Sequence, residues 1–354
     1  MLKRCFPIVA AAALAVTATV PLMTSQPAAA KDKGEVNLYS YRQPFLIKPI
    51  LDKFTEQTGI KVNVVYAQKG MLERIKAEGA AGPADAVLTV DIGRLQDMVD
   101  AGVLQPVTSS ILDKNIPANL RHPDGLWYGL TTRARVLFVS KDRVKPGTVK
   151  SYDDLADPRL KGKICIRSGK HVYNISLFAS VIAHKGKDGA KAWLNGLKNN
   201  LARKPQGNDR AQAKAIFQGV CDVALANTYY YAKMATNDKK PEQKKWAEAV
   251  RIVFPDQGKY GTHVNISGAA VVKGAQNKAN AVKLIEFLSG DFAQKLYADQ
   301  NYEYPVKPGV HVNPLVKSWG DFKADTLNLN EVGKNRAAAS KLVDEVRFNQ
   351  FSGS

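Results

Sequence analysis

Long hydrophobic runs are missing from this 354-residue sequence outside its first thirty residues. A membrane-spanning helix needs about 20 consecutive apolar residues, so no span is expected in the rest of the chain. The first thirty residues carry Lys3 and Arg4, then an apolar core, then small residues up to Ala30. This order is typical of a secretory signal peptide, and Pro21 ends the apolar core too early for a membrane anchor. We therefore predict a signal peptide over residues 1–30 and a soluble, exported mature chain.

Cysteine and histidine are also scarce, with three and five residues respectively. Cys5 falls within the predicted signal peptide, and Cys165 and Cys221 each lie in a short strand-like run. Export to an oxidising compartment favours a disulfide between these two, with two buried thiols as the alternative, because a sequence does not give their Cα separation. Two cysteines and histidines without paired spacing do not supply a tetrahedral zinc site.

Acidic residues are outnumbered by basic ones. Removing Lys3 and Arg4 from the 51 basic residues leaves 49 against 32 acidic residues, a formal charge of +17 for the mature chain. Such a charge attracts nucleic acids, anionic lipid surfaces or anionic ligands. The basic residues are dispersed, however, and no nucleic-acid motif or basic stripe with interleaved aromatics is present. We expect no nucleic-acid partner and interpret most of the lysines as a solvated basic face.

Sequence motifs of common enzymes are missing as well. No GxSxG nucleophile motif occurs, and the pattern GKICIRSGK has six residues between Gly162 and Gly169. That spacing is longer than a phosphate-binding loop allows. We therefore expect a protein that is not an enzyme.

Strand-like and helix-like segments alternate along the mature chain. The segment 35–41 alternates apolar and polar residues, an amphipathic helix follows from Pro44 to a stop at Gly59, and 84–90 reads as a buried strand. This order predicts an α/β protein with a largely parallel sheet.

Two apolar runs, at 127–141 and 263–274, are longer than an ordinary strand and lie on either side of a second α/β set. They would carry the chain out of one lobe and back into it. We therefore predict a two-lobe periplasmic-binding-protein fold of type II-like plan, with interlobe hinge strands and a central ligand cleft. The expected parts are lobe 1 at 31–132, lobe 2 at 133–262, and a return to lobe 1 with C-terminal helices at 263–354.

Several segments, taken in order along the chain, resemble one family. They are EVNLYSYRQPFLIKPILDKFTEQTGIKV, PADAVLTVD, SYDDLADPRLKGKI, CDVALANTYYY and NYEYPV. Together they cover essentially the whole mature chain and resemble the periplasmic ferric-iron-binding proteins of ABC iron importers, a bacterial transferrin-like group, in the branch with a YRQP loop. The resemblance rests on agreement in order along the chain, and no single motif decides it.

The family holds its metal mainly with tyrosine phenolates, and the resemblance implies that Tyr173, Tyr229 and Tyr230 are ligands here. Fe(III) is a hard cation that favours anionic oxygen, and a bound cation deprotonates a phenol whose free pKa is about 10. Adjacent side chains of a strand face opposite sides, so Tyr229 and Tyr230 converge only at a strand-to-helix turn. Tyr231 resembles a neighbouring aromatic that packs beside the site. Without the resemblance, a packed aromatic cluster is the simpler interpretation.

The loop YRQPF offers no ordinary ferric ligand, and the resemblance implies that an exogenous anion, commonly carbonate or bicarbonate, completes the coordination. Arg42 or Arg133 can orient such an anion with forked hydrogen bonds, and Gln43 can donate through its amide. An interlobe or surface salt bridge is the alternative for Arg133.

The resemblance implies a monomeric periplasmic solute-binding protein that captures ferric ion, or ferric chelates, and delivers the iron to an inner-membrane ABC permease. The alternative is a protein of the same fold that binds an organic cation, such as a polyamine or thiamine, or an oxyanion such as sulfate. Carboxylates among the tyrosines would favour an organic cation, and the stretch 227–234 contains none.

Overall fold

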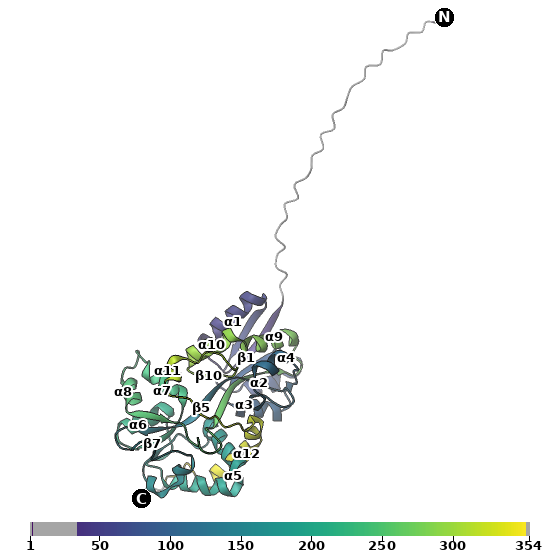
Figure 1. Ribbon diagram of the computed structural model, residues 1–354. Coiled ribbons are helices and arrows are strands. Elements are labelled where there is room, and N and C mark those ends of the chain that lie inside the picture. The colour runs from purple at the N-terminus through teal and green to yellow at the C-terminus, as the bar shows by residue number, and fades with distance from the viewer. Residues whose placement is uncertain (1, 3–33, 352–354) are drawn as a thin grey trace. The chain divides into compact units, whose positions relative to one another are not determined.

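The structure is a computed structural model that describes residue 2 and residues 34–351 (Figure 1). The predicted signal peptide, with Cys5, lies outside the described residues. Among the helices that are described, none is both long enough and apolar enough to cross a membrane.

The first lobe is built on a twisted sheet whose strand order begins β2-β1-β3-β9-β5. β1 pairs in parallel with both β2 and β3, whereas β9 runs antiparallel to β3 and β5. Short strands β4 and β10 pair with β9 and β5. We call this sheet and its helices lobe 1. The strands are β1 (Glu35–Ser40), β2 (Lys61–Tyr66), β3 (Ala86–Val90), β4 (Leu104–Gln105), β5 (Tyr128–Ser140), β9 (Val264–Val272) and β10 (Tyr304–Pro305).

The second lobe continues from the far half of β5. Residues 135–139 of β5 pair with β7, and residues 137–140 pair with β8, both antiparallel, while β6 runs parallel to β7. We call this part lobe 2. Its further strands are β6 (Ile164–Cys165), β7 (Val223–Asn227) and β8 (Val250–Val253).

The long run predicted at 127–141 therefore forms a single strand, β5, shared by both sheets, and the run at 263–274 forms β9 beside its first half. The prediction of a largely parallel sheet was wrong, because the sheet is mixed. Strands joined by a crossover helix pair in parallel. The two strands that connect the lobes run antiparallel to their neighbours, since one leaves lobe 1 and the other returns to it.

Helices cover the sheets on the faces where their apolar stripes are buried. The helix predicted after Pro44 is confirmed: it buries Ile47, Ile50 and Phe54 and ends where Gly59 takes a left-handed conformation. Lobe 1 carries α1 (Pro44–Thr58), α2 (Met71–Glu78), α3 (Ile92–Asp100), α4 (Ser110–Asn115), α9 (Lys278–Leu288) and α10 (Asp291–Asn301). The C-terminal helices are α11 (Pro314–Lys317) and α12 (Leu329–Glu345). Lobe 2 carries α5 (Val172–Asn199), α6 (Asp209–Phe217), α7 (Thr228–Ala235) and α8 (Glu242–Glu248).

The C-terminal helix α12 lies along α5 (Figure 1). Lys170, just before α5, binds Asp344 of α12, and Lys191 binds Glu345. Helix α5 is kinked at Gly186, whose backbone leaves the helical conformation. The tail of the chain therefore packs on lobe 2, although α12 also contacts α3 of lobe 1.

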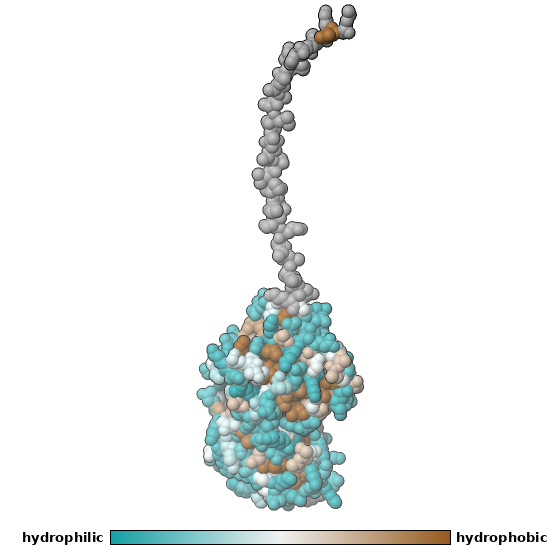
Figure 2. All heavy atoms as spheres, turned by 90° about the vertical axis from the view of Figure 1, so that its right-hand side faces the viewer, coloured by the Kyte–Doolittle hydropathy of each residue, from teal (hydrophilic) through white to brown (hydrophobic). Residues whose placement is uncertain are grey.

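In lobe 2, small apolar residues pack on one face of the sheet, around Phe138 and Met234. Cys165 of β6 is bonded to Cys221, which lies two residues before β7, and their Cα atoms are 5.9 Å apart. This bond ties the edge strand β6 to the strand that leads into α7. Outside the core, hydrophilic residues dominate the face seen in Figure 2, and hydrophobic residues gather there in smaller patches.

Candidate metal centre

Three phenol rings meet at the N-terminal ends of two helices in lobe 2. Tyr229 and Tyr230 lie in the first turn of α7, and Tyr173 lies in the first turn of α5. The hydroxyl oxygens of Tyr229 and Tyr173 are 3.2 Å apart, and the ring centroids of Tyr229 and Tyr230 are 4.5 Å apart. A helix N-terminus carries partial positive charge, which stabilises an anionic phenolate near it.

The strand-to-helix turn at Asn227 makes this convergence possible. β7 ends at Asn227 and α7 begins at the next residue, so Tyr229 and Tyr230 point about 100° apart around a helix instead of to opposite faces of a strand. Their rings are in contact. The Asn227 amide donates to the Tyr229 hydroxyl at 3.4 Å and accepts from Nη1 of Arg135 at 3.0 Å. Asn227 thus links the first phenol to the hinge strand β5.

Tyr231 does not join the other rings. It packs edge-to-face against Phe138 of β5 and against Trp319, with centroid distances of 6.3 Å and 5.7 Å. Of the three consecutive tyrosines, two therefore face Tyr173 and the third contributes to packing.

The protonation of the phenols follows from their burial. Burial raises the pKa of Tyr229 well above its ordinary value of 10.0, with smaller raising effects from Tyr173 and Tyr230. Burial also raises the pKa of Tyr230. The charges of Arg133 on Tyr229 and of Arg167 on Tyr230 act in the opposite direction. Both phenols are therefore protonated at neutral pH until a cation replaces the proton.

Positive side chains surround the rings. Each stands over the face of one phenol, at a distance compatible with cation–π attraction. They are Arg133 at 5.7 Å and Arg167 at 5.1 Å from the Tyr173 centroid, Arg210 at 5.1 Å from the Tyr230 centroid, and Lys233 at 5.4 Å from the Tyr229 centroid. Burial lowers the pKa of Lys233 to about 8. Four cations therefore lie over the rings, and buried carboxylates accompany two of them, Asp209 beside Arg167 and Asp91 beside Arg133.

A buried carboxylate beneath the three tyrosines binds residues from several elements. Asp209 begins α6 and is fully buried. It accepts from Nη1 of Arg135 at 2.6 Å, from Nη1 of Arg167 at 3.1 Å and from the backbone N–H of Asn227 at 2.9 Å. A single side chain therefore fixes β5, the end of β7 and the cation beside Tyr173.

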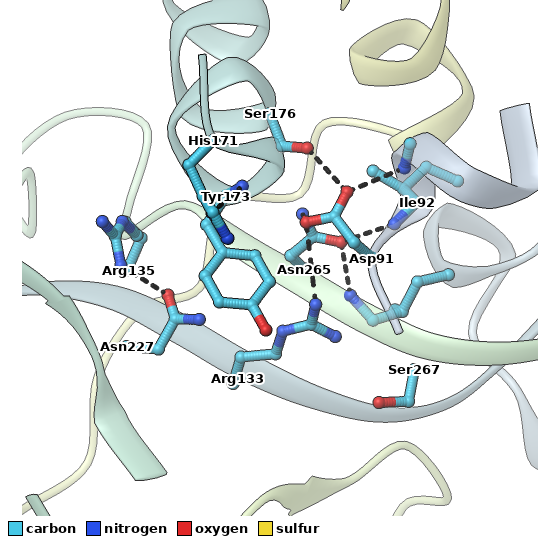
Figure 3. A network of polar contacts seen from close by, with 12 residues as sticks. Asp91, Ile92, Arg133, Arg135, His171, Tyr173, Ser176, Asn227, Asn265 and Ser267 are labelled. Carbon is cyan, nitrogen blue, oxygen red and sulfur yellow. Dashed lines mark hydrogen bonds and ion pairs between the residues drawn. The ribbon is translucent and has the colours of Figure 1, made fainter. Parts of the chain in front are cut away.

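Arg133 projects from β5 toward the ring of Tyr173 and toward Asp91 (Figure 3). Its side chain is 2 % exposed, yet among the described residues neither of its terminal nitrogens has a hydrogen-bond partner. The nearest carboxylate oxygen, on Asp91, is 3.7 Å from Nη2. A buried guanidinium with free N–H groups next to the phenols is well suited to bind an anion in forked geometry.

The other two residues predicted to hold an anion have different surroundings. Arg42 is buried in lobe 1, where Nη2 donates to Glu303 at 3.0 Å and to Ser267 at 2.5 Å. Glu303 also accepts a short hydrogen bond from Thr131. Gln43 is exposed and precedes α1 without a side-chain capping bond. Arg42 is therefore already committed to a salt bridge, and the roles of both residues stay predictions.

Sequence reasoning missed the carboxylates beneath the site. Asp91, Asp209 and Glu303 are all buried. Asp209 binds two arginines and Glu303 binds one, all remote in sequence, and Asp91 lies 3.7 Å from another. The position of Asp91 at the carboxyl end of a predicted strand could have singled it out, because α/β sheets bind ligands at that edge. No comparable signal marks Asp209. Within residues 34–351, no group of three His, Cys, Asp or Glu residues is placed to hold a metal ion.

Two sheets joined by β5 and β9, with a polar cluster where they meet, are the structural plan of a solute-binding protein. A family model described as bacterial extracellular solute-binding protein matches residues 82–324. The chain belongs to this family. Its two-lobe α/β fold and the resemblance drawn from its sequence motifs are confirmed.

Similar proteins point to a narrower group. The chain is 47 % identical over 315 residues to iron uptake protein A1 of Synechocystis sp. (strain ATCC 27184 / PCC 6803 / Kazusa), covering 89 % of this chain and 87 % of that protein. It superposes with a TM-score of 0.86 and 56 % identity on ferric iron-binding protein A of Mannheimia haemolytica in an open conformation, covering 90 % of this chain and all of that one. A Trichodesmium protein, IdiA (FutA), solved with iron and citrate ligands, gives a TM-score of 0.86 at 47 % identity, covering 88 % of this chain and 99 % of that one. These relatives are binding and uptake proteins.

Proposed function

We propose that the protein captures ferric iron in the periplasm and delivers it, as a monomer, to an inner-membrane ABC permease. Tyr173, Tyr229 and Tyr230 bind the ion as phenolates, and an exogenous anion such as carbonate completes the coordination. The observation that carries the proposal is the meeting of three phenols at two helix N-termini, where two hydroxyl oxygens lie 3.2 Å apart. The iron-related names of the relatives support the choice of metal.

The chemistry of loading follows from the state of the phenols. Tyr229 and Tyr230 are protonated in the absence of metal because burial raises the pKa of each. Fe(III) replaces these protons, and each new phenolate lies near the positive end of a helix. Three phenolates balance the charge of the ion. The four cations over the rings outnumber the carboxylates beside them, Asp209 and Asp91, so the site still favours an anion. Arg133 is the best-placed donor for it, because its terminal nitrogens have no hydrogen-bond partner among the described residues.

The order of binding follows from the lobe division proposed from the sequence. With lobe 2 at 133–262, all three tyrosines belong to lobe 2, so iron docks there first. Lobe 1, comprising 31–132 and the sheet and helices of the returning segment 263–354, then closes by bending of β5 and β9, while α12 stays packed on α5. The cargo shifts the protein toward the closed form only through its stronger binding to that form.

A visible absorption titration tests the proposal. Iron-free protein is titrated with a ferric chelate, with and without bicarbonate, and a phenolate-to-iron charge-transfer band should saturate near one iron per chain. Tyr230→Phe should lose or strongly shift the band. Tyr231→Phe is a matched control, because the neighbouring ring packs on Phe138 and Trp319 and its band should equal that of wild type. A colourless protein at every ratio would refute the proposal.

An oxyanion is the second candidate cargo. The free terminal nitrogens of the buried Arg133 favour it, and the four cations over the rings oppose an organic cation. In the titration above, binding of phosphate or sulfate to a protein that stays colourless with ferric chelates would select this candidate.

A further inference from the structure

Asp91 has a strained backbone at the point where lobe 1 meets lobe 2. It follows β3 directly, precedes α3 and is completely buried. Its φ of 85° and ψ of 128° form a combination that residues other than glycine rarely adopt. Its backbone N–H donates to the carbonyl of Ile266 on the connecting strand β9 at 2.8 Å. Such strain persists only where the surroundings determine the conformation, and it is concentrated at functional positions.

The carboxylate of Asp91 is held by three donors from three elements (Figure 3). Oδ1 accepts from the backbone N–H of Gly93 at 2.8 Å and from the hydroxyl of Ser176 on α5 at 2.9 Å. Oδ2 accepts from the amide of Asn265 on β9 at 2.9 Å. The Asn265 amide cannot be reversed without loss, because its oxygen accepts from the backbone N–H of Ile92. Asp91 is therefore fixed in position without any contribution from Arg133.

Arg133 lies next to this carboxylate without a hydrogen bond to it. Nη2 is 3.7 Å from Oδ2, and in the part of the chain that the structure describes, Nη1 and Nη2 have no hydrogen-bond partner. A buried guanidinium requires a nearby negative charge, and Asp91 supplies it. Because the three other donors already hold Asp91, Arg133 keeps its own donors available on the side of the phenols.

We propose that Asp91 is the built-in counter-anion of Arg133 and that the anion accompanying the cargo takes over this role when the protein loads. Before loading, Asp91 compensates the charge of Arg133. During loading, the guanidinium turns its N–H groups to a small oxyanion, such as carbonate or phosphate, that presents two oxygens to the fork. Asp91 stays behind, held by Gly93, Ser176 and Asn265. Its remaining charge repels the anion, so Asp91 sets how tightly the anion is bound and eases its release. This inference rests on the proposed function, since it concerns the anion of the same site.

The test uses inorganic phosphate and bicarbonate with the iron-free mature protein, and calorimetric titration measures the dissociation constant. Asp91→Asn removes the negative charge that repels the bound phosphate from the other side of the Arg133 guanidinium. The Coulomb repulsion across that distance corresponds to about a tenfold change, so phosphate binding should tighten about tenfold. Arg133→Gln should abolish binding. A purely structural role of Asp91 would not tighten anion binding.

Melting temperatures provide a second measurement. Asp91→Asn should lower the melting temperature of the iron-free protein more than that of the phosphate-saturated protein. Glu303 acts on Arg133 in both states, but only the iron-free protein loses the charge of Asp91 without a bound anion in its place. Equal losses in both states, with unchanged phosphate affinity, would overturn the inference.

A second variant keeps the inference testable if Asp91→Asn does not fold. Ser176→Ala removes the hydroxyl that holds Oδ1. The carboxylate is then less restrained, so Oδ2, which is 3.7 Å from Nη2, can approach Arg133 and phosphate binding should weaken severalfold. Ser180→Ala is the matched control: its hydroxyl lies one turn further along the same helix and donates to the carbonyl of Leu177, so phosphate affinity should not change. Weakening by both serine variants alike, or by neither, would refute the inference.

The visible iron titration separates this inference from the proposed function. Wild-type protein that forms the iron band but binds none of the anions would overturn the counter-anion role and leave iron capture intact. Colourless protein whose phosphate affinity still rises in Asp91→Asn and is lost in Arg133→Gln would support the counter-anion role and refute iron capture.

Discussion

Replacing Asp209 by Asn should destabilise the protein far more than replacing a carboxylate in a surface salt bridge. Asp209 is fully buried and is shared by two guanidinium groups, those of Arg135 and Arg167, which are 2 % and 9 % exposed. Asparagine has nearly the same shape and can still accept from the backbone N–H of Asn227. The substitution therefore removes the charge and leaves two neighbouring buried cations without compensation.

The expected magnitude follows from the cost of such a loss. Breaking a buried ion pair by removing one partner costs about 3–5 kcal/mol. Because Asp209 serves two arginines, we expect the upper half of this range. At roughly 2 °C per kcal/mol for a chain of this size, the melting temperature of the iron-free protein should fall by about 8–10 °C. Iron loading should weaken as well, since Arg167 would no longer be fixed beside Tyr173.

Urea unfolding monitored by tryptophan fluorescence measures the change in the free energy of unfolding. Asp222→Asn is the matched control. Asp222 also binds an arginine at 2.6 Å, but Arg143 is 38 % exposed, so the loss should stay below about 1 kcal/mol. A midpoint for Asp209→Asn no lower than that of Asp222→Asn, with the same dependence on urea, would refute the idea that buried charge compensation stabilises lobe 2.

Three further outcomes follow from the structure. Loading with iron should release about three protons per ion in weakly buffered solution, and Tyr173→Phe should release about one fewer, since each phenolate replaces a phenol; an equal release would exclude that ring as a ligand. Burial lowers the pKa of His263 to about 3. The neutral ring therefore contributes to stability above its unfolded pKa of about 6.5, and this contribution is lost as the pH falls toward 3. His263→Asn should flatten the decline of the melting temperature between these two pH values, and an unchanged slope would contradict this assignment. Replacing both Cys165 and Cys221 by Ser opens a loop with a sequence separation of 56, which should cost about 4 kcal/mol of stability in urea unfolding; an effect below about 1 kcal/mol would show that the cross-link constrains the unfolded chain little.

The plan of the fold could be predicted from local patterns. The two long apolar runs, the amphipathic helix after Pro44 and its stop at Gly59 are all confirmed, because hydrophobic periodicity and chain-breaking residues act over short stretches. Strand direction could not be predicted in the same way. Whether β9 runs parallel or antiparallel to β3 depends on how the chain returns from lobe 2, and no residue within β9 encodes that route.

Part of the candidate site could be predicted from a local sequence pattern, and part could not. The consecutive tyrosines follow an apolar strand in the sequence, and this pattern, together with the family resemblance, is enough to single out Tyr229 and Tyr230. Tyr173 was indicated by the resemblance alone. The structure brings its hydroxyl to 3.2 Å from that of Tyr229, across 56 residues of chain.

The α/β class, the two connecting strands and the residue types of the site follow from the sequence, because each depends on composition or on contacts between near neighbours. The export signal stays a prediction. Which charged side chains meet depends on how the chain folds. Arg133, Asp91 and Ser176 come from three separate elements, and the free donors of Arg133 result from the way other groups occupy Asp91. Electrostatic compensation in a buried site depends on distances of a few ångströms between remote residues, and those distances exist only once the chain has folded.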